Sequence, residues 1–198
     1  MRHRFFVLGI VLTLAGRAFG QADSPKAALS AQDAAARAGK VDDDRGFYQA
    51  DSEQQKKLAE VIAHGDIALA RLQIAVARQF GKELAAAVAH AAGTEDIDDI
   101  QSATEKVDGD HATIEFKDHS TPLRMVKTDG SWKISLSDML KDSDSDAVEQ
   151  LARTIEKLTV QLNQIAGLVE HQKFRSGEGV RDRVQEVHDR LFGAAQDK

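Results

Sequence analysis

Residues 107–136 read "VDGDHATIEFKDHSTPLRMVKTDGSWKISL", and this stretch decides the fold. Its apolar side chains alternate with polar ones, as Ala112, Ile114 and Phe116 do, and such alternation is typical of a half-buried β-strand. Two Asp-Gly pairs in the stretch suit the two-residue turns of β-hairpins. We therefore expect four strands between about residues 100 and 136, joined by three tight turns into an antiparallel meander with one apolar face.

A long helical pattern precedes these strands. It begins at Ser52, stops at Gly93, and carries one apolar stripe whose members recur at spacings of three, four or seven residues. The stripe consists of Leu58, Ile62, Leu69, Leu72, Val76, Phe80, Leu84 and Val88. Gly65 and Gly81 each weaken the helix by about 1 kcal/mol relative to Ala, so the helix could break near Gly65. A sheet with one apolar face is not stable alone, and we expect this stripe to cover it.

The segment before this helix is expected to hold one short helix and one loop. Ser24 as N-cap, Pro25 at the first helical position and Gly39 as a stop predict the helix. The following residues 40–51, "KVDDDRGFYQAD", form a loop by composition. Its adjacent aspartates, Asp42–Asp44, cannot all point in one direction, so we interpret them as a solvated turn and not as metal ligands.

The most regular pattern lies near the C-terminus. A heptad seam runs over three repeats, is broken by "SGEG", and is followed by a second apolar series. The two seams consist of Val148, Leu151, Ile155, Leu158, Leu162, Ile165 and Val169, and of Val180, Val184, Val187 and Leu191. Asp146 and Glu149 form a capping-box pair at the start. Two seams around a glycine-containing turn predict an antiparallel helical hairpin, and the alternative is that the longer seam also recruits a second copy of the chain.

The N-terminus predicts export. Residues 1–20 have the charged, apolar and small-residue order of a signal peptide, with cleavage after Gly20 or after Ala22 and an uncleaved anchor as the alternative. Cleavage after Gly20 leaves 23 basic and 32 acidic residues, a formal charge of about −9 that disfavours nucleic acid and anionic membranes. The chain has no cysteine. We expect a periplasmic or extracellular product with no stable membrane anchor.

No grouping of residues indicates a catalytic, metal or cofactor site. Asp142, Asp144 and Asp146 resemble the start of a calcium loop, but Ala147 and Arg153 stand where a glycine and a bidentate glutamate are needed. The histidines show no metal-ligand spacing, and no phosphate-binding, nucleophile-elbow or kinase motif occurs.

Two histidines could still meet in the meander. His111 and His119 lie on either side of its second turn, although we interpret both as solvent-facing residues.

Four aromatic residues are candidates for the wall of a ligand cavity. Phe80, Phe116 and Trp132 are predicted on inner faces, where they either fill the space between helix and sheet or line a cavity in it. Tyr48, the sole tyrosine, could supply a hydrogen bond there. We interpret Trp132 mainly as a core residue that would become part of a wall if a pocket exists.

The segments "GDHATIEF" and "RMVKTDGSWKISL" give the chain a family resemblance. They resemble the secreted branch of the nuclear transport factor two-like (SnoaL-like) superfamily, over about residues 25–138. The matching residues are Lys127, Asp129, Gly130, Trp132, Lys133 and Ile134, with Gly109, Ala112 and Ile114 one hairpin earlier. The resemblance implies a curved antiparallel sheet wrapped around helices into a cone. Enzymes of this superfamily use an acid and a base inside the cone, and we match neither to a position here.

These observations predict an α+β protein. Its expected parts are a signal peptide (1–20), N-terminal helices packed on a four-stranded cone-like meander (21–140) and a C-terminal helical hairpin (141–198). One hypothesis is a non-enzymatic interaction or assembly module that works through the hairpin seam, as a homodimer or with another protein. The alternative is a small-molecule binding protein, or a weak enzyme, that holds a small apolar ligand between helix and sheet.

Overall fold

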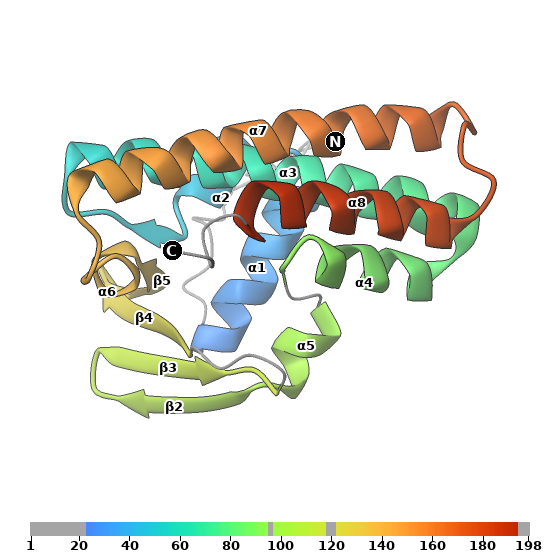
Figure 1. Ribbon diagram of the computed structural model, residues 1–198. Coiled ribbons are helices and arrows are strands. Elements are labelled where there is room, and N and C mark those ends of the chain that lie inside the picture. Colours follow the sequence, from blue (N-terminus) through green and yellow to red (C-terminus); the bar gives the residue numbers. More distant parts are fainter. Residues whose placement is uncertain (1–22, 95–96, 118–121, 194–198) are drawn as a thin grey trace, which may run out of the picture.

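Helices make up one part of the protein and a five-stranded sheet the other, so the predicted α+β class is confirmed (Figure 1). The computed structural model describes residues 23–94, 97–117 and 122–193. In chain order the elements are α1 (Pro25–Arg37), α2 (Val41–Arg45), β1 (Tyr48–Gln49), α3 (Glu53–Phe80), α4 (Lys82–Ala91), α5 (Ile97–Ser102), β2 (Thr104–Asp108), β3 (His111–Glu115), β4 (Leu123–Thr128), β5 (Ser131–Ser135), α6 (Leu136–Met139), α7 (Ser145–Glu170) and α8 (Gly177–Phe192).

The predicted meander is present and forms most of the sheet, whose strand order is β1-β5-β4-β3-β2. Asp129 and Gly130 both have positive φ, 53° and 77°, as a type I′ turn between β4 and β5 requires. The fifth strand, β1, was not among the expected four, because two residues carry no recognisable alternation. Its Tyr48 and Gln49 pair in parallel with Ile134 and Ser135 of β5.

Helix α1, and not the long helix, packs directly on the sheet. Ala28 and Leu29 of α1 belong to the same buried cluster as Ile114, Met125 and Trp132 of the sheet. Figure 1 shows α1 between the sheet and the layer formed by the long helices. The prediction that the long helix covers the sheet is therefore wrong for most of its length.

The apolar stripe of α3 instead packs mainly against the C-terminal hairpin. Leu72 and Val76 of α3 share a buried cluster with Leu162 of α7 and Val184 of α8. The physical reason is length, because 28 residues of helix extend about 42 Å, whereas a strand of 5 residues extends about 17 Å. The heptad seam of α7 offers a matching surface of similar length. The predicted helical hairpin is thus confirmed, and it shares its core with α3 and α4.

Glycines mark two features of this helical layer. α3 passes through Gly65 without a break, and an added Cβ there would lie 3.3 Å from Cγ2 of Ile155, so the glycine permits a close approach to α7. The break comes at Gly81, whose φ of 99° favours glycine.

Side-chain caps mark the starts of the longer helices. Ser24 caps α1 as predicted, and Ser52, the expected start of the long helix, caps α3. The expected capping box of α7 is wrong, because the N-cap is Asp144, whose carboxylate accepts a hydrogen bond of 2.8 Å from the Ala147 amide. Asp146 lies in the first turn instead, where its charge still complements the helix dipole.

The predicted signal peptide, residues 1–20, lies outside the described residues, and so does His119. Within the three described ranges, none of the helices has the length and apolar character that a membrane crossing needs.

Candidate functional site

A pocket of about 410 Å³ opens between α1, the middle of α3 and the sheet. Most of its wall is apolar. The lining residues are Leu29, Gln32, Asp33, Ala36, Tyr48, Ile62, Asp66, Leu69, Ala70, Gln73, Thr94, Ile100, Phe116, Pro122, Leu123, Ile134 and Met139. We call it the acid pocket, because two carboxylates line it and none of its described lining residues is basic.

Three of these residues form a hydrogen-bonded group at one side of the acid pocket, which we call the polar cluster. The Tyr48 hydroxyl donates to Oδ2 of Asp66 at 2.9 Å, and Nε2 of Gln32 donates to the same oxygen at 3.2 Å. Nε2 of Gln32 also lies 2.6 Å from the Tyr48 hydroxyl oxygen. The three side chains come from α1, β1 and α3, so the parallel pairing of β1 with β5 is what brings Tyr48 to Asp66.

Asp44 of α2 is a second acid next to this polar cluster, and unlike the half-buried Asp66 it is fully buried. Its side chain is inaccessible to solvent, and neither carboxyl oxygen has a hydrogen-bond partner of ordinary geometry in the described part of the chain. Gln32 lies close enough to lower the pKa of Asp44, but the geometry of a normal hydrogen bond is not met. The interpretation of Asp42–Asp44 as a solvated turn is therefore wrong for Asp44. An unsatisfied buried polar group costs about 1–3 kcal/mol, and such a group needs an explanation.

Burial raises the pKa of both Asp44 and Asp66, but to different values. Burial, and after it the negative charge of Asp66, together raise the pKa of Asp44 to about 8. Burial raises the pKa of Asp66 to about 6, against the hydrogen bonds from Tyr48 and Gln32, which lower it. At neutral pH Asp44 is therefore mostly neutral and Asp66 mostly ionised. Burial, with the charges of both acids, raises the pKa of Tyr48 well above its ordinary value, so its hydroxyl stays a neutral donor.

The second carboxylate of the pocket wall already has a cationic partner. Nε of Arg37 lies 2.7 Å from Oδ2 of Asp33, and its NH2 group donates to Oε1 of Gln73 at 3.3 Å. Asp66 has no basic partner within ion-pair distance in the described ranges. The pocket thus presents one uncompensated negative charge on a mostly apolar surface.

Two of the four predicted wall residues line this pocket. Tyr48 and Phe116 do, whereas Trp132 is 4% exposed and lies in the cluster beneath the sheet. Phe80 lies away from the pocket and packs against the helical core. It is close to Gly177: a Cβ added to that glycine would lie 3.0 Å from the Cβ of Phe80.

The sequence reasoning missed both acids, although a signal for one of them was present. Asp66 and Gln73 continue the spacing of Ile62 and Leu69 by steps of four, three and four, so they are polar residues on an apolar stripe. Asp44 carried no signal of this kind, because its burial depends on how α2 packs against α1 and α3.

Neither metal coordination nor family membership adds to this site. In the part of the chain that the structure describes, no three histidines, aspartates or glutamates are grouped so as to hold a metal ion. Scans against protein-family models, curated proteins and solved structures found no match to the chain. The resemblance to the nuclear transport factor two-like superfamily stays a prediction.

Proposed function

We propose that the protein binds a small molecule with an apolar body and a cationic or hydrogen-bond-donating head, most simply a protonated amine, in the acid pocket. The observation that carries this proposal is the isolated carboxylate of Asp66, oriented by Tyr48 and Gln32 in an apolar pocket. Pockets with apolar walls and a few fixed polar groups are the usual sites for small ligands. The resemblance to the nuclear transport factor two-like superfamily supports the same location, since it would place a ligand between helix and sheet.

The charge of the head follows from the lining residues. A ligand carboxylate would be repelled by the carboxylates of Asp66 and Asp33, and none of the described lining residues is basic and could neutralise it. A protonated amine would instead form a charge-assisted hydrogen bond with Asp66, and bonds to charged groups contribute about 1.5–3 kcal/mol. In an exported protein this binding would take place in the periplasm or outside the cell.

The assembly hypothesis has less support. Its motive was the heptad seam of α7, but Leu162, Ile165 and Val169 of that seam are buried inside the chain against α3, α4 and α8. The same apolar residues therefore already have partners within one copy of the protein.

Three ligands with one apolar body test the proposed function. At a pH of about 7.5, 3-phenylpropylamine is expected to bind at least about tenfold more tightly than 3-phenylpropanol, with 3-phenylpropanoate the weakest, as measured by isothermal titration calorimetry. Asp66→Asn should remove the preference for the amine, because the amide keeps the shape of the site without the charge. Asp142→Asn, which removes a charge from an exposed loop, is the matched control and should leave the order unchanged.

Equal affinities for the three ligands would overturn the proposed head group. Absence of binding for all three would overturn the proposal as a whole.

A further inference from the structure

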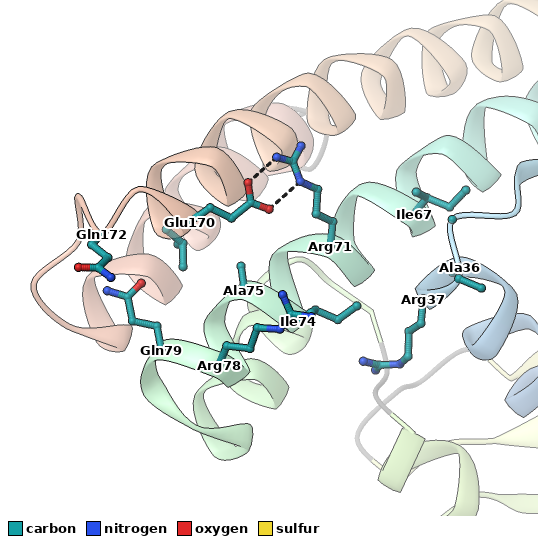
Figure 2. Close-up of a pocket in the computed structure, with 13 residues that line it drawn as sticks. Ala36, Arg37, Ile67, Arg71, Ile74, Ala75, Arg78, Gln79, Glu170 and Gln172 are labelled. Atoms are coloured by element: carbon teal, nitrogen blue, oxygen red, sulfur yellow. Dashed lines mark hydrogen bonds and ion pairs between the residues drawn. The ribbon is translucent and has the colours of Figure 1, made fainter.

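A second, larger hollow of about 870 Å³ lies between the C-terminal end of α1, the second half of α3 and the end of α7 (Figure 2). Its lining residues are Ala36, Arg37, Ala38, Gly39, Ile67, Arg71, Ile74, Ala75, Arg78, Gln79, Val169, Glu170 and Gln172. We call it the arginine groove, after Arg37, Arg71 and Arg78. It touches the acid pocket only through Ala36 and lies outside the proposed function.

The sequence of α3 builds both the floor and one side of this groove. Ile67 and Ile74 are seven residues apart, as are Arg71 and Arg78, so each pair occupies one face of the helix two turns apart. Figure 2 shows Arg71, Ile74 and Arg78 along the face of α3 that lines the groove, with Arg37 approaching from α1. The groove thus combines an aliphatic floor with guanidinium groups on its rim.

Two of the three arginines are neutralised within the protein. Arg71 holds Glu170 in a bidentate pair with distances of 2.9 and 2.6 Å, and its NH1 group donates to Asn163 at 3.2 Å. Glu170 is the one carboxylate among the described lining residues, and this pair fixes it on Arg71. Arg37 is paired with Asp33 through Nε, while its NH1 group makes no hydrogen bond to residues 23–94, 97–117 or 122–193.

Arg78 supplies the unbalanced charge. It is exposed and forms no ion pair within the described part of the chain, although its positive charge helps to lower the pKa of Glu170 after the stronger effect of Arg71. The chain as a whole has a formal charge of −6. The net positive charge on the rim of the groove is therefore opposite in sign to the charge of the whole protein.

We propose that the arginine groove binds the oxyanion of a small amphiphile, a carboxylate or a phosphate on a short alkyl chain, with Arg78 as its main contact. The planar guanidinium matches carboxylate and phosphate oxygens in a bidentate fashion, as the Arg71–Glu170 pair already does in the same groove. Arg37, although paired with Asp33, can add a hydrogen bond from its NH1 group. The alkyl chain lies on Ile67 and Ile74.

Four probes test this proposal by protein NMR at constant ionic strength: octanoate, octyl phosphate, octanol and inorganic phosphate. We expect the two amphiphilic anions to shift the amide signals of residues 67–79, with at least about tenfold higher affinity than octanol or inorganic phosphate. The tighter of the two anions identifies the head group.

Three variants locate the contact. Arg78→Gln is expected to lower the affinity for the anions about tenfold. Arg78→Lys, which keeps the charge without the planar fork, should recover only part of it. Arg124→Gln removes the same charge from an exposed position on β4 and should change the affinity less than about twofold. Because Arg78 is exposed, all variants should melt at the wild-type temperature.

Three results would overturn the proposal. Octanol could bind as tightly as the anions, Arg124→Gln could weaken binding as much as Arg78→Gln, or the signal shifts could lie at Phe116 and Ile134. The last result would place the probes in the acid pocket. The proposed preference of that pocket for an amine would still be tested separately, by the calorimetry with the three phenylpropyl ligands.

Discussion

Replacing Asp44 by asparagine is expected to stabilise the protein at pH 8 and to remove most of the pH dependence of its free energy of unfolding. Burial raises the pKa of Asp44 from 3.8 to about 8, so between these values the folded state binds more protons than the unfolded state. Stability must then fall as the pH rises through this window, and it levels off above pH 8. Since one pKa unit corresponds to about 1.4 kcal/mol, the loss is roughly a few kcal/mol.

The sign of this effect is opposite to that of an ordinary paired carboxylate, which loses stability as the pH falls. Asp66 contributes in the same direction over a narrower window, because its pKa is raised only to about 6. In the Asp44→Asn variant only the contribution of Asp66 should remain. Urea denaturation at a series of pH values between about 4 and 9 measures both slopes.

The matched control lies two residues earlier in the same helix. Asp42 is exposed and pairs with Arg45 at the surface, so Asp42→Asn is expected to change stability by less than about 1 kcal/mol at any pH. A wild-type slope in the Asp44→Asn variant would show that Asp44 is not held neutral in the folded protein.

The second large effect is expected from Trp132→Ala, which should lower the free energy of unfolding by about 3–5 kcal/mol. Trp132 is 4% exposed and packs with Leu29, Met125 and Ile134 in the cluster between α1 and the sheet. The Lys127 ammonium lies 5.7 Å from the centre of its ring and adds a cation–π contact on one side. Truncation leaves a large cavity in this core, between α1 and the sheet.

Two further variants separate the core role of Trp132 from a role in binding. Since small domains are stable by only about 5–15 kcal/mol, Trp132→Phe is the milder change for binding studies. It should keep the affinity for 3-phenylpropylamine within about twofold, because Trp132 does not line the acid pocket. Val107→Ala, at a residue 53% exposed on β2, should cost less than about 0.5 kcal/mol. A stability loss for Trp132→Ala as small as that of Val107→Ala would contradict the core assignment.

The local elements of this fold could be predicted from the sequence because their signals are local. The alternation of apolar and polar residues, together with the turn residues, located the four strands of the meander. Ile114 and Met125, for example, were expected on the apolar face and lie in one buried cluster. The caps Ser24 and Ser52 and the heptad of α7 located helices. The partner of each apolar face was not predictable, since α1 and α3 both offered surfaces that could cover the sheet.

The candidate site could be predicted only in part for the same reason. Tyr48 and Phe116 were expected near a cavity, and they line one. The acids depend on contacts between distant segments. The pairing of Tyr48 with Ile134 holds β1 on the sheet, and the packing of α2 against α1 and α3 places Asp44 near Asp66. No spacing within residues 40–51 encodes that pairing. Asp66 was detectable in principle, as an acid on the apolar stripe of α3.

The central claim is that the half-buried carboxylate of Asp66 holds a cationic ligand, and a carbon-13 NMR titration of its carboxyl carbon tests this most directly. In the free protein the titration is expected to show a pKa of about 6 for Asp66. With saturating 3-phenylpropylamine the midpoint should move to lower pH, because the ligand's positive charge favours the ionised carboxylate. A midpoint near the ordinary value of 3.8 in the free protein, or one that the amine leaves unchanged, would contradict the account.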